Sequence, residues 1–268
     1  QMCIRDSIKS FYRRSDMSML ELTPDFIKEF AAYLSTEAGL RNGSIWANCM
    51  WLKGVVMKAH YNGLIPRNPF IQFHISPNVK EREYLTEDEL KAVMTHEFAD
   101  SKLAYIRDIF IFASFTALSF VDIQELTNDN IVEVNGEKWI LSKRHKTKVA
   151  FQVKLLDIPL QIVERYRPMQ KDNRIFPGLN YWSICKPLKR MIRECGITKS
   201  ISFHCSRHGF ATLALSKGMP IESVSRVLGH TNIVTTQLYA KITTQKLDND
   251  LTMFGDKLSK TFNGITMS

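Results

Sequence analysis

The sequence predicts a mostly helical α+β protein with a small antiparallel sheet, divided into two units. Long stretches keep apolar residues three or four positions apart, which is typical of amphipathic helices. A cluster of proline, glycine and asparagine residues within 62–78 interrupts this spacing and indicates a boundary. Alternating residues on either side of Asn135-Gly136 predict a β-hairpin farther along the chain. We therefore expect one unit at 8–78 and a second at 79–268.

The first unit is expected to be helical from residue 8 to about residue 73. Thr23 fits an N-cap and Pro24 the first helical position, where the missing N–H of proline costs no hydrogen bond. Residues 44–61 form a second amphipathic stretch that ends where the breakers begin. Residues 1–7 show no pattern, and the chain starts at Gln1. We expect 1–7 to be disordered or a scar of sequence assembly, and the sequence to be a fragment.

Helices also open the second unit. Residues 85–90 read as a helix start, with Thr86 as the N-cap and Glu89 at the third helical position of a capping box. The apolar stretch at 103–118 predicts a long buried helix. It is shorter than the roughly 20 residues of a membrane span.

Strands are expected in the middle of the second unit. Residues 131–134 and 138–142 flank the Asn-Gly pair, whose preference for positive φ fits a type I′ turn. Residues 149–155 alternate and are expected to form a third strand. Helical patterns return after Pro159.

The composition favours an anionic partner. The chain has 36 Lys+Arg against 27 Asp+Glu, a formal net charge of +9 and a pI of about 9.3, and such a balance attracts phosphates. Many basic proteins bind no nucleic acid, so charge alone does not decide. Five cysteines without a C-x-x-C pair argue against a disulfide framework or a zinc ribbon. Without a signal-peptide pattern or a long apolar run, we expect a cytoplasmic protein that does not bind a membrane.

Two short polar blocks and a tyrosine are the strongest functional signal. His204, Arg207 and His208 lie in His-Cys-Ser-Arg-His, His230 ends Leu-Gly-His, and Tyr239 follows nine residues later. An arginine can bind a phosphate with two N–H groups, and histidines donate protons or hydrogen bonds. A tyrosine hydroxyl can attack phosphorus and form a covalent intermediate. The order and spacing therefore predict phosphate chemistry.

The first block is expected to begin a helix. His204, Arg207 and His208 would then share one face, with Ser202 as the cap before them. Positive and donor groups at a helix N-terminus suit a phosphate. The alternatives are a solvated basic turn and a zinc site on the two histidines. Zinc is disfavoured because Cys205 would point away from that face and no carboxylate follows at metalloprotease spacing; we expect no metal.

The second block and the tyrosine have ordinary explanations when taken singly. Gly229 fits the C′ position that ends a helix, so His230 would project from the break. Tyr239 could simply pack in a core. The spacing of all the motifs together favours the functional interpretation.

This combination resembles the tyrosine recombinases, the phage-integrase family of site-specific DNA strand-exchange enzymes. That family carries His-x-x-Arg, then Leu-Gly-His, then a nucleophilic tyrosine about nine residues on, as this chain does. The resemblance is strongest between Tyr84 and Lys241. It implies a helical core-binding, SAM-like DNA-binding lobe at 8–78, and at 79–268 a mixed catalytic lobe of the DNA breaking-rejoining type with a C-terminal tail. Many members carry a further N-terminal arm-binding domain.

One arginine of the family pattern is missing. Members usually end the long apolar helix with Thr-Gly-Leu-Arg, whereas this chain has Thr-Ala-Leu and then Ser119. Losing one preorganised oxyanion donor costs about 10²–10³ in rate, so a replacement is expected. Arg144 is preferred, because it lies two residues before Lys146 and would leave an extended strand on the same face. Arg107 is the alternative, about 18 Å along a helix from Ser119. The integrases of Bacteroides-type conjugative transposons share this loss.

The segment at 142–148 is basic and carries no acidic residue. The family places its general-acid lysine in this hairpin, and Lys146 in Arg-x-Lys-Thr fits best; such a group must reach the leaving oxygen. Lys148 and Lys143 remain alternatives and are otherwise expected to contact DNA. A hairpin tip that touches only the DNA backbone is the simpler explanation.

The resemblance implies strand exchange without a cofactor. Tyr239 would attack a DNA phosphodiester to give a 3′-phosphotyrosyl adduct, and Lys146 would protonate the leaving 5′-oxygen. Arg207 and Arg144 would neutralise the non-bridging oxygens. His204 and His230 would donate hydrogen bonds or move the tyrosine proton, with His208 and Ser119 in supporting positions.

The implied partners are double-stranded DNA, a homo-tetramer on it, and accessory DNA-bending proteins. An apolar stripe within 247–258 would dock either on a neighbouring protomer or on its own lobe. Two other functions stay open: a non-catalytic DNA-binding protein of the same fold and a type IB topoisomerase-like enzyme. The target DNA sequence is not readable from the chain.

Overall fold

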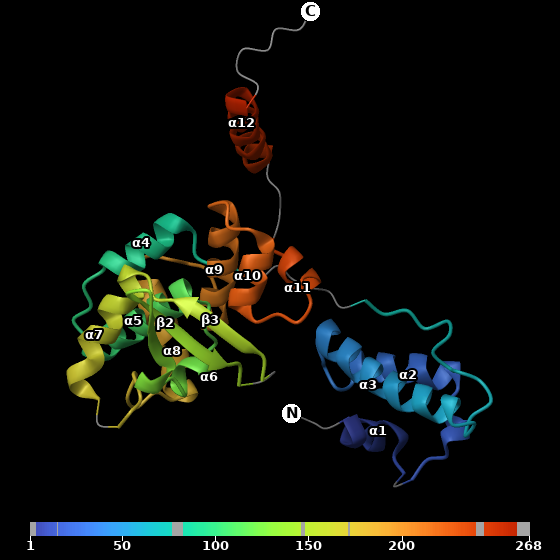
Figure 1. Ribbon diagram of the computed structural model, residues 1–268. Coiled ribbons are helices and arrows are strands. Elements are labelled where there is room, and N and C mark those ends of the chain that lie inside the picture. The colour runs from blue at the N-terminus through green and yellow to red at the C-terminus, as the bar shows by residue number, and fades with distance from the viewer. Residues whose placement is uncertain are drawn as a thin grey trace, which may run out of the picture. The chain divides into compact units, whose positions relative to one another are not determined.

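The computed structural model describes residues 4–14, 16–76, 83–145, 148–170, 172–239 and 244–261 (Figure 1). The chain divides into two compact units, Gln1–Glu81 and Arg82–Ser268. The boundary that the sequence suggests near residue 78 falls in a stretch outside the described residues. Each unit has its own apolar core.

The first unit is helical. It consists of α1 (Ile4–Tyr12), a 3₁₀ turn (Met19–Glu21), α2 (Pro24–Thr36) and α3 (Asn42–Tyr61). The predicted start of α2 is confirmed, since the Thr23 hydroxyl oxygen accepts a hydrogen bond from the Phe26 N–H and Pro24 occupies the first position. Phe30 of α2 and Cys49 of α3 lie fully buried between the helices.

The expectation for residues 1–7 is wrong in part. Residues 4–7 belong to α1, and Ser7 is buried. The reason is tertiary: the Phe11 ring of the same helix packs edge-on against Phe26, with centroids 5.3 Å apart. That contact orders a segment whose own sequence has no helix signal.

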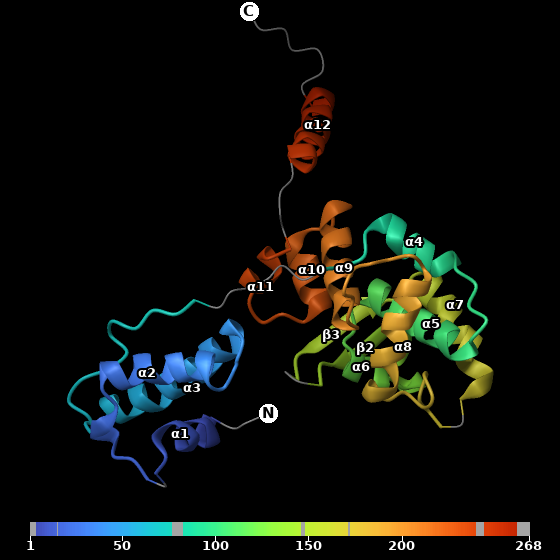
Figure 2. The ribbon, with the colours of Figure 1, turned by 180° about the vertical axis from the view of Figure 1, so that it is seen from behind.

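The second unit surrounds α5 (Figure 2). Its elements in chain order are α4 (Glu87–Thr95), α5 (Ser101–Thr116), α6 (Phe120–Gln124), a 3₁₀ turn (Asn128–Asn130), β1 (Ile131–Val134), β2 (Glu137–Lys143), β3 (Ala150–Lys154), α7 (Asp157–Tyr166), a 3₁₀ turn (Arg167–Met169), α8 (Tyr181–Glu194), α9 (His204–Ser216), α10 (Ile221–Leu228), α11 (Val234–Gln237) and α12 (Thr244–Thr261). Helices α4, α7, α8 and α9 pack against α5, whose residues Ile109 to Ala113 are all buried. The capping box of Thr86 and Glu89 at the start of α4 is confirmed.

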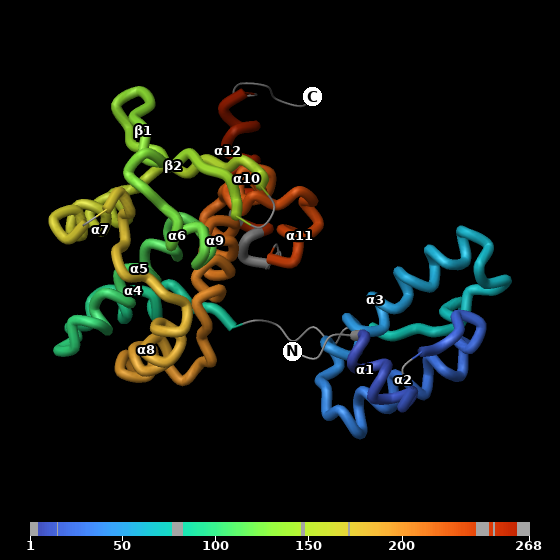
Figure 3. Tube along the Cα trace, turned by 90° about the horizontal axis from the view of Figure 1, so that it is seen from below, coloured from blue at the N-terminus to red at the C-terminus, as the bar shows by residue number. Residues whose placement is uncertain are grey.

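The sheet is antiparallel with strand order β1-β2-β3. Ile140 lies opposite Ile131 on one side and Val153 on the other. Asn135 and Gly136 both have positive φ, 53° and 77°, as the predicted type I′ turn requires. Helix α10 lies against β3 and beside α9 (Figures 1 and 3). The predicted fold class is confirmed.

The helix expected at 103–118 ends earlier. Thr116 is the last residue of α5, and Ala117 turns the chain with φ 56° in the left-handed region. Ser119 then caps the short α6. Two sharp turns therefore replace the last turn of the expected helix and redirect the chain toward β2 and α10.

The apolar stripe expected at 247–258 lies on α12, where Leu251 and Phe254 are more than half exposed. None of the helices in the described ranges has the length and apolar character that a membrane span requires.

Candidate active site

Helix α9 presents the first motif. It begins at His204, so that His204, Arg207 and His208 lie on its first turns. The expected cap at Ser202 is wrong, because Phe203 occupies the N-cap position with helical angles and no side chain caps the helix. The Ser202 hydroxyl instead lies 3.3 Å from the Cys205 Sγ. Cys205 is buried in the apolar core of the second unit.

The end of α10 presents the second motif. Gly229 has φ 62° and closes the helix in the left-handed conformation, as predicted. The Gly229 N–H donates to the carbonyl of Arg226 at 2.9 Å, and the His230 N–H donates to that of Ser225 at 3.1 Å. These bonds satisfy two of the four carbonyls that every helix leaves open at its C-terminus.

Two arginines satisfy the remaining carbonyls. Arg144 Nη2 donates to the carbonyl oxygen of Val227, and Arg207 Nη2 donates to that of Leu228. The two guanidinium groups are therefore held side by side at the negative end of the α10 dipole, which favours cations. Arg144, at the end of β2, and Arg207, on α9, come together only through this helix terminus.

The Arg144 side chain is buried, and hydrogen bonds and a ring contact fix its guanidinium group. Only 5% of its surface is exposed. Nη1 donates to Asp122 Oδ2 at 2.8 Å, and the guanidinium carbon lies 4.0 Å from the centroid of the Phe151 ring. Its backbone N–H bonds the carbonyl of Val149. The Nε finds no acceptor among the described residues.

Asp122 is a site residue that sequence reasoning missed. Its carboxylate accepts hydrogen bonds from Arg144, from the Ser119 hydroxyl at 2.7 Å and from the His145 backbone N–H at 3.0 Å. Burial raises the pKa of Asp122, but these bonds outweigh it and hold the pKa below its usual value. The Ser-x-x-Asp spacing of a capping box was the available signal.

Ser119, which stands where the family has an arginine, is a structural cap. Its hydroxyl accepts the Asp122 N–H and donates to the carboxylate of the same residue, so Ser119 orients the counter-ion of Arg144. Arg144, which follows β2, thus places a positive charge next to this position through the same carboxylate.

Arg207 is bound at both ends of its fork. Nη1 donates to the carbonyl of Ala117 at 2.8 Å, which the left-handed turn after α5 directs at it. Burial, and then the charge of Arg144, lower the pKa of Arg207 to about 10, against the opposing effects of Tyr239 and Asp122. Arg207 therefore stays charged at neutral pH.

His230 is neutral at neutral pH. Burial is the largest cause, followed by the charges of Arg207 and Arg144, and together they lower its pKa to about 4. The ring Nδ1 lies 2.9 Å from the Thr236 Oγ1, which fixes the orientation of the imidazole. The other nitrogen can then accept or donate a hydrogen bond.

Tyr239 follows α11 and lies beside these groups. Its ring centroid is 5.1 Å from that of His208, which is 4.6 Å from that of His204. The ring also packs against the apolar cluster that joins α9 to α10. The structure thus brings together the arginines, the histidines and the tyrosine that the sequence singles out, from four separate places in the chain: the residue after β2, helix α9, the end of α10, and the segment after α11.

The basic segment 142–148 lies only partly within the described residues. Lys146, the preferred general acid, lies outside the described residues. Lys143 ends β2 and Lys148 has φ 56°; both are exposed. Their side chains are accessible to a polyanion.

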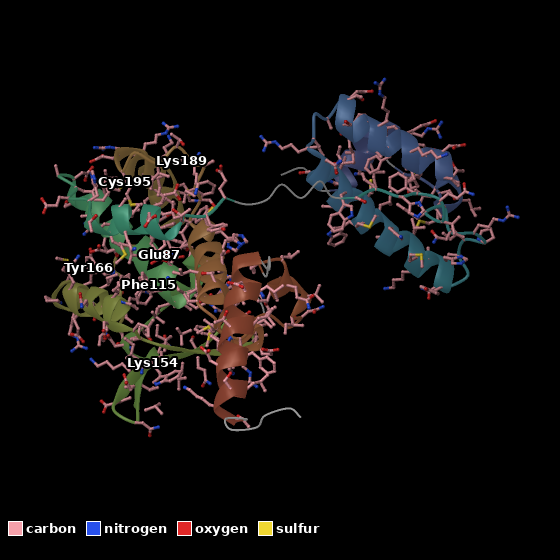
Figure 4. All side chains as sticks on the ribbon, turned by 90° about the horizontal axis from the view of Figure 1, so that it is seen from above. Glu87, Phe115, Lys154, Tyr166, Lys189 and Cys195 are labelled. Carbon is pink, nitrogen blue, oxygen red and sulfur yellow. The ribbon has the colours of Figure 1, made fainter. Side chains whose placement is uncertain are left out.

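Arg107 lies in a different network. Its Nε donates to Asp108 at 2.9 Å and its Nη1 to the carbonyl of His96 at 2.9 Å. Tyr166 of α7, labelled in Figure 4, and Arg165 bind the same Asp108. Arg107 therefore ties the end of α4 to α5, and its neighbour Asp108 ties α7 to α5. Arg107 lies about ten helical residues or 15 Å from Ala117.

Comparison with known proteins identifies the class. Residues 83–246 match the phage integrase family and residues 3–75 match the phage integrase SAM-like domain. The chain therefore belongs to the phage integrase family, the tyrosine site-specific recombinases.

Named relatives agree with this class. Tyrosine recombinase XerA of Pyrococcus horikoshii is 32% identical over 61% of this chain, and the chain spans 58% of its length. Tyrosine recombinase XerC of Lactobacillus leichmannii is 25% identical over 80% of this chain and 77% of that protein.

Solved structures share the fold. The Tn1549 transposon integrase in complex with a circular intermediate DNA superposes with a TM-score of 0.75 at 17% identity, covering 94% of this chain and all of that one. A lambda integrase dimer bound to a core site has a TM-score of 0.69 at 18% identity, covering 88% and 86%.

The depressed pKa of His230 makes stability depend on pH. Between its unfolded pKa of about 6.5 and its folded value of about 4, the unfolded state binds the proton more tightly. This contribution is complete above pH 6.5 and is lost as the pH falls toward 4. The urea midpoint should thus fall more between pH 7 and pH 5 for the wild type than for His230→Asn. Equal falls in both proteins contradict the burial of a neutral imidazole. His74→Asn in the first unit serves as the control.

Proposed function

We propose that this chain is a recombinase or integrase that cleaves and rejoins DNA through a 3′-phosphotyrosyl intermediate, in the integration or excision of a mobile element. The observation that carries the proposal is the pair of guanidinium groups at the end of α10, with Tyr239 beside them. The Tn1549 integrase, whose fold this chain shares, has been solved in complex with transposon right end DNA and circular intermediate DNA. The serine at position 119 supports a kinship with Bacteroides-type integrases.

Two fixed cations suit the chemistry of a phosphodiester. Attack by the tyrosine oxygen places extra negative charge on the two non-bridging oxygens. Arg144 and Arg207 are buried, so their charges act through a lower dielectric than water, and they need little reorganisation when that charge develops. In the proposed reaction each arginine binds the phosphate through N–H groups that are not bonded to the Val227 and Leu228 carbonyls, without a change of side-chain position.

Proton transfer completes the proposed reaction. The Tyr239 hydroxyl must lose its proton during attack, and a neutral His230 is able to accept it or to hydrogen-bond the phosphate. His208 lies beside the Tyr239 ring and His204 beside His208, and both are proposed as further donors. Lys146 is proposed to protonate the leaving 5′-oxygen, with Lys143 and Lys148 as alternatives.

A nicked suicide substrate carrying the recombination site tests the nucleophile. The wild type should leave a covalent protein–DNA band on a denaturing gel, and Tyr239→Phe should leave none, because the attacking oxygen is gone. Tyr181→Phe, at an exposed tyrosine of α8, should keep the band.

The same assay separates the alternatives. Tight binding by the wild type with no band on any nicked substrate would indicate a non-catalytic DNA-binding protein. A band on DNA without the site, together with relaxation of supercoils, would indicate a type IB topoisomerase-like enzyme.

Arg144 is proposed to replace the missing first arginine. Arg144→Ala should slow adduct formation by about 10²–10³-fold, the cost of one oxyanion donor, while DNA affinity stays largely intact. Arg144→Lys, which keeps the charge but loses the fork, should be slowed as well. Arg107→Ala should retain the wild-type rate once its lower stability is matched by temperature. Wild-type cleavage by Arg144→Ala would remove Arg144 from the reaction.

A tetramer on DNA is the proposed assembly, with accessory DNA-bending proteins as further partners and the bacterial nucleoid as the place of action. The exposed stripe of α12 supports it, since Leu251 and Phe254 offer an apolar face that a neighbouring protomer can cover.

Deleting the chain from Lys246 onward should weaken pairing of two DNA sites in a gel-shift assay but spare single-site binding. Unchanged pairing would favour a role of α12 within its own protomer, and Phe254→Asp tests the same face with one substitution.

A further inference from the structure

Gly229 is crowded where a side chain would begin. A Cβ built at this position would lie 2.9 Å from the Arg144 Nε and 3.0 Å from its Cγ. Non-bonded carbon atoms normally approach to about 3.5–4.0 Å. The space that any other residue would need at position 229 is therefore taken by the stem of Arg144.

The stem of Arg144 is unable to move aside. The Arg144 backbone N–H donates to the Val149 carbonyl, and the Arg144 carbonyl accepts from the Lys148 N–H. At its other end, the guanidinium bonds Asp122 and the Val227 carbonyl and stacks on the Phe151 ring. A shift large enough to admit a Cβ at position 229 would break one of these contacts.

The turn alone does not demand glycine. A helix that ends in the left-handed conformation accepts asparagine as well as glycine at this position. Gly196 is a matched case: it follows α8, has φ 75°, and makes the same pair of closing bonds through its own N–H and that of Ile197. Nothing lies within 4 Å of a Cβ built there. The two turns differ because the Arg144 side chain lies against Gly229, whereas the space beside Gly196 is open.

We propose that Gly229 is a positioning residue for Arg144. The absence of a side chain at Gly229 opens a slot between that residue and Phe151, and the slot directs the Arg144 guanidinium to its place beside Arg207. The predicted effect of Gly229 on DNA cleavage rests on the proposed function of Arg144. The existence of the slot does not depend on that function.

Matched substitutions in the full chain test the slot. Gly229→Asn keeps a residue that tolerates the turn but adds a Cβ, and Gly196→Asn makes the same change where space is open. Gly196→Asn should lower the Tm only by the cost of asparagine in a left-handed turn, and Gly229→Asn should lower it by about 4 °C or more beyond that, as overpacking of a buried site predicts. In an Arg144→Ala background, Gly229→Asn should lower the Tm no more than Gly196→Asn does. An equal loss of Tm with and without Arg144 overturns the proposal.

Cleavage gives the second readout. Gly229→Asn should slow single-turnover adduct formation on the nicked substrate by about 10²-fold, close to the effect of losing one oxyanion donor, with DNA affinity within about threefold of the wild type. Gly196→Asn should cleave at the wild-type rate. A wild-type rate for Gly229→Asn, in a protein that is slowed by Arg144→Ala, overturns the positioning role.

The two proposals fail separately. If Arg144→Ala itself cleaves at the wild-type rate, the role of Arg144 in the reaction fails, and the Tm comparison alone then decides whether the slot exists. If Gly229→Asn does not fold, Gly229→Ala is compared with Gly196→Ala by the same two measurements.

Discussion

The end of α10 holds two arginines from distant parts of the chain, and the rest of the site depends on this contact. Like charges repel, but the Val227 carbonyl accepts from Arg144 and the adjacent Leu228 carbonyl accepts from Arg207, which holds the two side by side. The helix dipole favours positive charge at this terminus, and Asp122 supplies a full negative charge. One buried anion and three backbone oxygens, those of Val227, Leu228 and Ala117, thus stabilise a pair of cations that would otherwise repel each other.

Short turns, rather than long helices or strands, set the direction of the groups that bind the two arginines. The left-handed Ala117 directs its carbonyl to Arg207, and Ser119 holds the carboxylate that bonds Arg144. Gly229 ends α10 and leaves room for the Arg144 stem. The serine that replaces the usual arginine of the family is therefore part of the support for its proposed substitute. Burial first, and then the charges of the same two cations, lower the pKa of His230 and keep it neutral, so one arrangement serves both phosphate binding and proton transfer in the proposed reaction.

Local features of this protein were predictable from the sequence because they depend on neighbouring residues. The caps at Thr23 and Thr86, the Asn135-Gly136 turn and the helix end at Gly229 each need only a few consecutive residues. The fold class followed from the same local periodicity. Spacing along the chain also singled out the arginines, the histidines and the tyrosine of the candidate site, although it missed Asp122 and assigned Ser202 a capping role that it does not have.

Tertiary contacts decided what depends on distant residues. Residues 4–7 belong to a helix whose Phe11 packs on a neighbouring helix, and α5 stops at Thr116, where the left-handed Ala117 turns the chain and its carbonyl accepts from the distant Arg207. Spacing could propose Arg144 as a phosphate ligand, but only the folded chain gave it a counter-ion, an aromatic neighbour and a slot. A charge buried in the interior needs partners from several elements at once, and no local pattern records which elements will meet.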